Sequence, residues 1–131
     1  MTDDNKQLIR KLYDEVLNAR QLDDLERYIA DPQLIETINR GCLVLYESFP
    51  DLHSSIDEMV AEGDKVSVRA TSTGTHDGDF MGTPPTGRHI SFEYSEIYGI
   101  SDGMIQTYWC LPDMAGLMRQ VTQETPVGSS A

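Results

Sequence analysis

The chain has 131 residues, of which 39% are hydrophobic and 24% charged, a size and composition that indicate one folded domain with a real core rather than a disordered segment. Its formal net charge of −12 argues against nucleic acid and anionic membranes as partners, because binding phosphate requires lysine and arginine. No apolar run approaches the ~20 residues that span a bilayer. The opening MTDDNKQ lacks the basic and apolar regions of a signal peptide, so the expected compartment is the cytoplasm.

The first third of the chain has apolar residues at helical spacing. The spacing predicts one helix over residues 4–19 and a short second helix from Leu22 to Ala30. A third begins at Asp31-Pro32, since proline is favoured in the first turn of a helix, and Pro50 ends it.

The remainder is mainly strand, with alternating β-branched residues and tight turns. The predicted strands are Leu52–Glu62, Lys65–Thr75, His89–Ile100 and a last one from Met104 that Pro112 ends. Residues 75–88 are rich in glycine and proline, and loops of this length are often lids or binding loops. A short helix follows Pro112, and we expect one domain over residues 1–120 with a loose tail over 121–131.

This order, helices first and then an antiparallel meander, predicts an α+β fold. Long strands joined by short turns make a curved sheet, and a helix laid across its concave face leaves a cone-shaped cavity.

Asp113 is the first candidate for chemistry. It lies between the last strand and an apolar helical run, so it is either the N-cap of that helix or a carboxylate on the Trp109 face inside an apolar cavity, where its pKa would rise. One residue could serve both roles.

Metal and thiol chemistry are not expected. His76-Asp77-Gly78-Asp79, with His53 and His89, matches no strong ligand spacing, and a turn-forming loop is the simpler interpretation. Cys42 and Cys110 form no CxxC pair and are predicted to be buried free thiols.

Four pieces of the chain stand out together: FPDL at Phe49–Leu52, AEGDKVSVR at Ala61–Arg69, GTHDGDFMGTPPTGR at Gly74–Arg88, and the Asp-Gly turn that leads to Trp109 and Asp113. With them the chain resembles the SnoaL-like polyketide cyclases of the nuclear-transport-factor-2-like superfamily. The resemblance covers nearly the whole chain except the tail, and it implies a cone-shaped α+β barrel with N-terminal helices packed on a curved antiparallel sheet.

The resemblance also implies a reaction. Such cyclases close the last ring of an aromatic polyketide by an intramolecular aldol reaction without metal or organic cofactor, and Asp113 matches the position of their general acid/base. The implied partner is a hydrophobic, polycyclic small molecule. Core and pocket wall share residues in a cone fold, so we expect the substrate to contact Tyr13, Phe49, Met59, His76, Tyr94, Tyr108 and Trp109. The sequence leaves open whether Tyr94, Glu96 and Tyr98 or the residues between them face the cavity.

Two other function classes stay open. One is a different cofactor-free reaction in the same cavity: isomerisation, hydration, epoxide opening or assistance to a hydroxylation. The other is binding without catalysis, as a small-molecule carrier or a dimerisation module. A homodimer through the free face of the sheet is expected in either case, because apolar area left there usually marks an interface.

Overall fold

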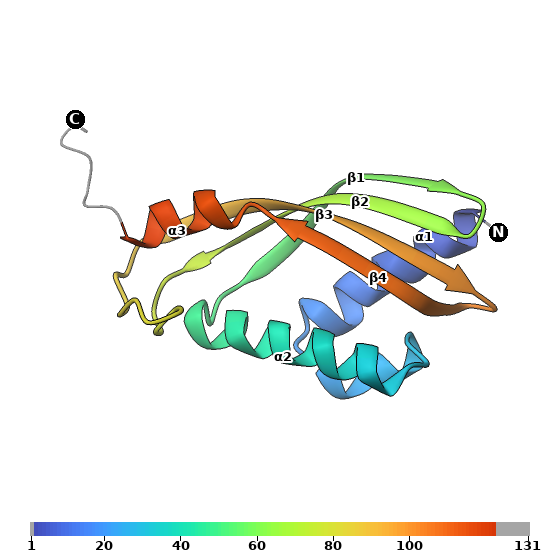
Figure 1. Ribbon diagram of the computed structural model, residues 1–131, viewed down its shortest axis with the longest axis horizontal. Coiled ribbons are helices and arrows are strands. Elements are labelled where there is room, and N and C mark those ends of the chain that lie inside the picture. Colours follow the sequence, from blue (N-terminus) through green and yellow to red (C-terminus); the bar gives the residue numbers. More distant parts are fainter. Residues whose placement is uncertain (1, 123–131) are drawn as a thin grey trace.

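Four antiparallel strands form one curved sheet in the order β1-β2-β3-β4 in the computed structural model, which describes residues 2–122 (Figure 1). The strands are β1 (His53–Glu62), β2 (Lys65–Thr75), β3 (His89–Ser101) and β4 (Met104–Pro112). In the view of Figure 1, α2 (Pro32–Ser48) lies below the sheet, and α3 (Met114–Thr122) follows the end of β4. The predicted α+β class and the antiparallel meander are therefore confirmed.

The N-terminal helix changes from α-helical to π-helical geometry part-way along. α1 (Thr2–Lys11) continues directly into a π-helical segment, η1 (Leu12–Leu17), and a 3₁₀ segment, η2 (Leu22–Arg27), follows. The second helix ends earlier than predicted, because Ile29 forms a parallel bridge with Ile105 of β4. A π-helical turn inside a helix is rare and often accompanies a functional site.

α2 (Pro32–Ser48) begins and ends as predicted. The Asp31 side chain accepts a hydrogen bond of 2.9 Å from the Gln33 backbone N–H, which caps the helix, and Pro32 occupies its first turn. In Figure 1 this helix lies beneath the concave face of the sheet. It therefore faces the inner side of the strands.

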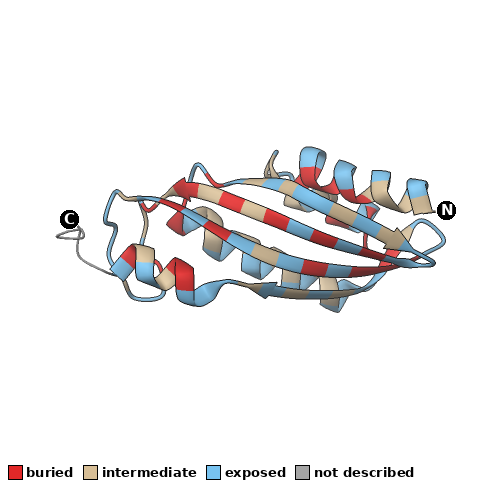
Figure 2. Cartoon of the chain, turned by 90° about the horizontal axis from the view of Figure 1, so that it is seen from above, coloured by how far each residue is buried: buried red, intermediate tan, exposed pale blue. Residues whose placement is uncertain are grey.

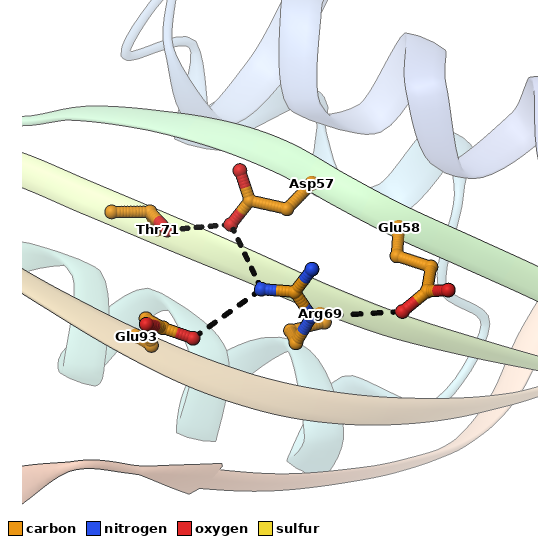
Figure 3. A network of polar contacts seen from close by, with 5 residues as sticks. All are labelled: Asp57, Glu58, Arg69, Thr71 and Glu93. Atoms are coloured by element: carbon orange, nitrogen blue, oxygen red, sulfur yellow. Dashed lines mark hydrogen bonds and ion pairs between the residues drawn. The ribbon is translucent and has the colours of Figure 1, made fainter.

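The two faces of the sheet differ in chemistry. Figure 2 shows buried and exposed residues alternating along β2 and β3. On the outer face Arg69 lies within 4 Å of three carboxylates, those of Asp57, Glu58 and Glu93 (Figure 3). Exposed apolar side chains lie on the same face, with Ile97 and Trp109 directly paired between β3 and β4.

One irregularity in β4 decides which of its side chains face inward. Ile100 pairs with Ile105 and Gly99 pairs with Thr107, so Gln106 is an unpaired extra residue, a β-bulge. Simple alternation puts Ile105 on the face of Trp109. The bulge instead puts Ile105 on the inner face with Tyr108, where both belong to the same apolar cluster.

The chain's last described element is α3 (Met114–Thr122). Val121 is 1% exposed and packs in a core cluster, so the first two residues of the predicted tail belong to the helix. The rest of the predicted tail, residues 123–131, lies outside the described residues. Over residues 2–122 no helix combines the length and apolarity needed to cross a membrane.

Candidate active site

A cavity of about 400 Å³ lies between the inner face of the sheet and the helices. Its wall is mostly apolar, which is typical of small-molecule sites. The sheet contributes Ser54, Ser72, Phe92, Tyr94, Glu96, Tyr98, Tyr108, Cys110 and Pro112, and the helices contribute Leu12, Leu17, Leu25, Ile38, Cys42, Leu45 and Tyr46. The predicted cavity under the sheet is present.

Glu96 is the one carboxylate in this wall among residues 2–122. It lies at the middle of the sheet, paired with Val68 of β2 and Cys110 of β4, and is only 4% exposed. A buried charge is costly unless hydrogen bonds satisfy it. Its neighbours therefore decide what it can do.

Three phenol hydroxyls converge on this carboxylate. Tyr13 and Tyr98 donate to Oε1 at 2.5 and 2.9 Å, and Tyr108 donates to Oε2 at 2.8 Å. Tyr98 and Tyr108 are paired across β3 and β4, whereas Tyr13 comes from the π-helical segment. The arrangement is a short, charge-assisted network in an apolar setting.

Burial raises the pKa of Glu96 above its usual value, and the three phenol hydrogen bonds act in the opposite direction. Burial also raises the pKa of Tyr13, Tyr98 and Tyr108 well above the ordinary phenol value, with the nearby Glu96 charge adding to each rise. The tyrosines are therefore neutral donors. Glu96 is therefore the group that titrates, and its raised pKa is shifted toward neutral pH, which suits a general acid or base.

A second polar group continues from this network. The Tyr94 hydroxyl lies 3.0 Å from the Tyr13 hydroxyl, and the hydroxyls of Ser54 and Ser72 are 2.7 Å apart. Burial raises the pKa of Tyr94 to about 12, and the nearby Glu96 charge adds to this rise. Tyr94, Ser54 and Ser72 all line the cavity, so polar groups of its wall are found on β1, β2 and β3.

The two thiols both face this cavity. Burial raises the pKa of Cys42 to about 11 and also raises the pKa of Cys110. Both are free cysteines. They stay protonated at neutral pH and act as wall groups rather than as nucleophiles.

The loop over residues 76–88 lies at the mouth. Phe80 and the 68% exposed Met81 contribute to the wall. The Ser48 carbonyl at the end of α2 accepts hydrogen bonds from the backbone N–H groups of Asp77 and Gly78, both at 3.1 Å. This part of the predicted binding loop therefore borders the cavity and is tied to α2.

Asp113 lies elsewhere than the acid/base hypothesis requires. It is exposed and does not contribute to the cavity wall. Its Oδ1 accepts a hydrogen bond of 2.9 Å from the Gly116 backbone N–H, so it is the N-cap of α3. The expected position inside the apolar cavity is wrong, and the reason is the bulge at Gln106, which turns the Trp109 face outward.

The expected substrate contacts separate into two groups. Tyr94 and Tyr108 line the cavity, and Tyr13 bonds to Glu96 behind them. Trp109 is 49% exposed on the outer face, and Met59 borders a separate groove beside α1.

Phe49 belongs to a core cluster, and the ring of His76 packs beside it. Both are 0% exposed, and their rings are 5.7 Å apart. The His76 Nδ1 lies 3.0 Å from the Thr86 hydroxyl, a contact that joins the two ends of the loop over residues 76–88. Over residues 2–122 no group of three or more His, Cys, Asp or Glu side chains is arranged to hold a metal ion.

Sequence reasoning did not select Glu96, although a signal was present. Every second residue of β3 is apolar or aromatic except this one: Ile90, Phe92, Tyr94, Glu96, Tyr98, Ile100. A single carboxylate on an otherwise apolar face is the pattern of a buried functional acid.

Comparisons with known proteins agree with this fold. Residues 7–121 match the model of the family described as "SnoaL-like polyketide cyclase". The aklanonic acid methyl ester cyclase DnrD of Streptomyces peucetius is 26% identical over 137 residues, covering 91% of each chain. A crystal structure from Jannaschia sp. CCS1, assigned as a SnoaL-like polyketide cyclase, superposes with a TM-score of 0.84 at 25% identity and 94% coverage of both chains.

A further solved structure shows the fold alone. AclR from Streptomyces galilaeus, assigned as a hydroxylase, has a TM-score of 0.81 at 24% identity, covering 96% of this chain and 85% of its own.

Fold and site together define a cone-shaped α+β protein of the nuclear-transport-factor-2-like type, with a buried acid in an apolar cavity. The chain belongs to the SnoaL-like polyketide cyclase family.

Proposed function

We propose that this protein is a cofactor-free acid/base enzyme that closes a ring in a hydrophobic polyketide-type intermediate by an intramolecular aldol reaction, with Glu96 moving the proton. The observation that carries the proposal is the Glu96 carboxylate, 4% exposed, in the wall of an apolar cavity and within 2.9 Å of three phenol hydroxyls. A carboxyl with a pKa raised by burial is suited to removing a proton next to a carbonyl.

In the first step the ionised Glu96 takes a proton from the carbon next to a substrate carbonyl, and the C–H electron pair becomes an enolate. Glu96 then carries no charge and needs fewer donors than before. Tyr108, which faces the cavity, becomes free to donate its hydroxyl to the new enolate oxygen. A donor directed at developing charge stabilises the transition state in a site that excludes water.

In the second step the enolate carbon attacks another carbonyl of the same molecule and forms the ring bond. The alkoxide that results takes the proton back from Glu96, which returns to its ionised form. Atoms and charge balance, with no redox change and no leaving group.

The shape and composition of the cavity support a hydrophobic ligand. About 400 Å³ lies in the range of small-molecule pockets. The family and the 26% identical DnrD, named as an aklanonic acid methyl ester cyclase, support a polyketide ester as the first test compound.

The experiment compares two carboxylate variants on aklanonic acid methyl ester, with the cyclised product measured by chromatography. We expect Glu96→Gln to lower kcat by about 10²–10⁴-fold, the usual contribution of a positioned acid/base. Asp113→Asn is the matched control, because Asp113 is exposed and outside the wall. Equal turnover by wild type and Glu96→Gln would remove Glu96 from the mechanism.

Binding of the ester is measured in parallel by quenching of intrinsic fluorescence. Binding without conversion by the wild-type protein would favour the non-catalytic alternative, in which the satisfied Glu96 network serves only to fix the shape of the core.

A further inference from the structure

α2 contains a glycine, Gly41, in its interior. The helix begins at Pro32 and continues beyond this glycine to Ser48, so Gly41 does not end it. Glycine is the poorest helix former apart from proline, because it loses more backbone freedom on folding than any other residue. A glycine inside a helix therefore calls for a reason in backbone geometry, in packing or in contact with a ligand.

Neither backbone geometry nor packing requires glycine at this position. Gly41 is not among the glycines with positive φ. A Cβ built on it would have no atom of residues 2–122 within 4 Å, apart from the adjoining backbone of its own helix. By contrast, a Cβ at Gly78 would collide with the Glu47 carbonyl, so that glycine has a packing reason. Alanine would fit at residue 41 without strain.

Gly41 lies at the centre of the part of α2 that faces the cavity. A helix has about 3.6 residues per turn, so the residues three and four positions away are its neighbours on the same face. These neighbours are Thr37, Ile38, Val44 and Leu45, and all of them line the cavity, as Gly41 itself does. The α2 side of the wall therefore has a recess where its central side chain is missing.

This recess lies at the mouth of the cavity. Thr37 and Val44, on one side of Gly41, are exposed, whereas Ile38 and Leu45, on the other side, are half-buried. Gly41 is itself exposed, and it marks the boundary between solvent and the interior of the cavity. A side chain at this boundary would narrow the entrance.

We propose that Gly41 is a specificity-determining residue, whose missing side chain leaves the space in which a flat ring of the substrate lies against the α2 backbone. The inference rests on the proposed function, because it names how that site selects its substrate. Close approach of a ligand to the backbone is one of the uses for which a position requires glycine. The helix loses some stability at this position, and the cavity gains room for the ligand.

The two walls of the cavity suit a flat ring. On the helix side, the recess is only as wide as one missing side chain, and the apolar Ile38, Val44 and Leu45 surround it. On the sheet side, the wall includes the rings of Tyr98 and Tyr108, whose centroids are 5.2 Å apart. Aromatic rings pack favourably against one another, so a thin aromatic molecule finds contacts on both sides.

The first measurement is thermal stability. Gly41→Ala should raise the melting temperature by about 2–5 °C, because alanine is the better helix former and no atom obstructs its Cβ. Asn39→Ala is the matched control. Asn39 lies on the opposite side of α2, outside the cavity wall, and alanine also replaces a poorer helix former there. The control should raise the melting temperature as well.

The second measurement is binding, by calorimetry, of two probes: alizarin, which has flat fused rings, and methyl salicylate, which has a single ring. We expect Gly41→Ala to weaken alizarin binding by about 5–10-fold and Gly41→Leu by about 100-fold, since extra atoms in a filled space are costly. Methyl salicylate is small enough to avoid the recess, so Gly41→Ala should leave its affinity within about twofold of wild type. Asn39→Ala should change the affinity for neither probe.

Three results would overturn the inference. One is alizarin binding by Gly41→Leu within about twofold of wild type, and another is a wild-type protein that does not bind alizarin. The third is a lower melting temperature of Gly41→Ala, which would show that the fold itself needs the glycine. The outcome is separate from that of the enzyme test: the expected binding pattern together with full turnover by Glu96→Gln would retain the role of Gly41 and reject the cyclase mechanism.

Discussion

Tyr13 and Glu96, 83 positions apart in the sequence, meet through a hydrogen bond of 2.5 Å between the π-helical segment and the centre of the sheet. The bond ties the N-terminal helix to the only carboxylate that faces the cavity among residues 2–122. Its consequences can be measured without any substrate.

Removing this hydrogen bond should lower the free energy of unfolding more than removing an exposed hydrogen bond would. We expect Tyr13→Phe to lower the free energy of unfolding by about 1.5–3 kcal/mol at pH 8, since a hydrogen bond to a charged group contributes that much. At pH 4, where Glu96 is more protonated, the loss should be smaller. Urea denaturation at both pH values provides the measurement. Tyr28→Phe is the control, because its hydroxyl makes only a long 3.5 Å contact with Glu15.

Glu96 should also make stability depend on pH. Burial raises its pKa in the folded chain, so between the unfolded and folded pKa values the folded state binds more protons. Its contribution is fully present below the unfolded value of about 4.3 and is lost as pH rises through the folded pKa. The stability of wild type relative to Glu96→Gln should therefore fall as pH rises from about 4. A difference that is flat with pH, or that rises, would contradict a raised pKa.

Asp113 should behave as a helix cap. We expect Asp113→Ala to lower the free energy of unfolding by about 1 kcal/mol and Asp113→Asn to lower it by less, because asparagine also caps. Turnover of both variants should stay within a few-fold of wild type. A loss of 10² or more in Asp113→Asn would instead support the general acid/base role suggested by the family resemblance.

The cap also explains why residue 116 is glycine. A Cβ placed there would lie 2.2 Å from Asp113 Oδ2, so Gly116→Ala should disturb the cap and lower thermal stability.

The homodimer through the outer face of the sheet stays a prediction. Ile97 (41% exposed), Trp109 (49%) and Leu111 (62%) lie there beside the Arg69 network. We expect the wild type to scatter light as a dimer at micromolar concentration and Trp109→Glu to shift it toward monomer. Leu43→Glu, at a similarly exposed position on α2, should leave the mass unchanged. A wild-type monomer would refute the prediction.

Metal independence is tested directly. Treatment with a chelator should change neither the melting temperature nor turnover, because the His76–Asp79 loop offers no closed set of ligands. A loss that a divalent ion restores would show that this interpretation of the loop is incorrect.

The fold could be predicted from the sequence because its signals are local. The helical spacing before Pro50 and the alternation in β2 and β3 each report which face of an element is buried. The cap at Asp31 and the turns at Gly63 and Gly103, both with positive φ, then fix where elements end.

The site could be predicted only in part, because it depends on distant pairings. Tyr94 and Tyr108 were expected at the cavity, and both line it. The single carboxylate on the apolar face of β3 is a local signal for Glu96, but its contact with Tyr13, from another layer of the fold, is not predicted by any sequence pattern. Asp113 was misplaced because no local pattern reveals a bulge, which is a property of how two strands pair.

That extra residue in β4 matters when members of this family are compared. Because Gln106 is an extra residue, each side chain that follows it in β4 lies on the face opposite to the one that strict alternation from the hairpin would give. A chain that lacked it would pair regularly and keep Ile105 and Tyr108 on the inner face. Relatives matched by strand periodicity alone would therefore be aligned one position out of step on one side of the bulge, and the residues of their pockets would be exchanged with residues of their surfaces.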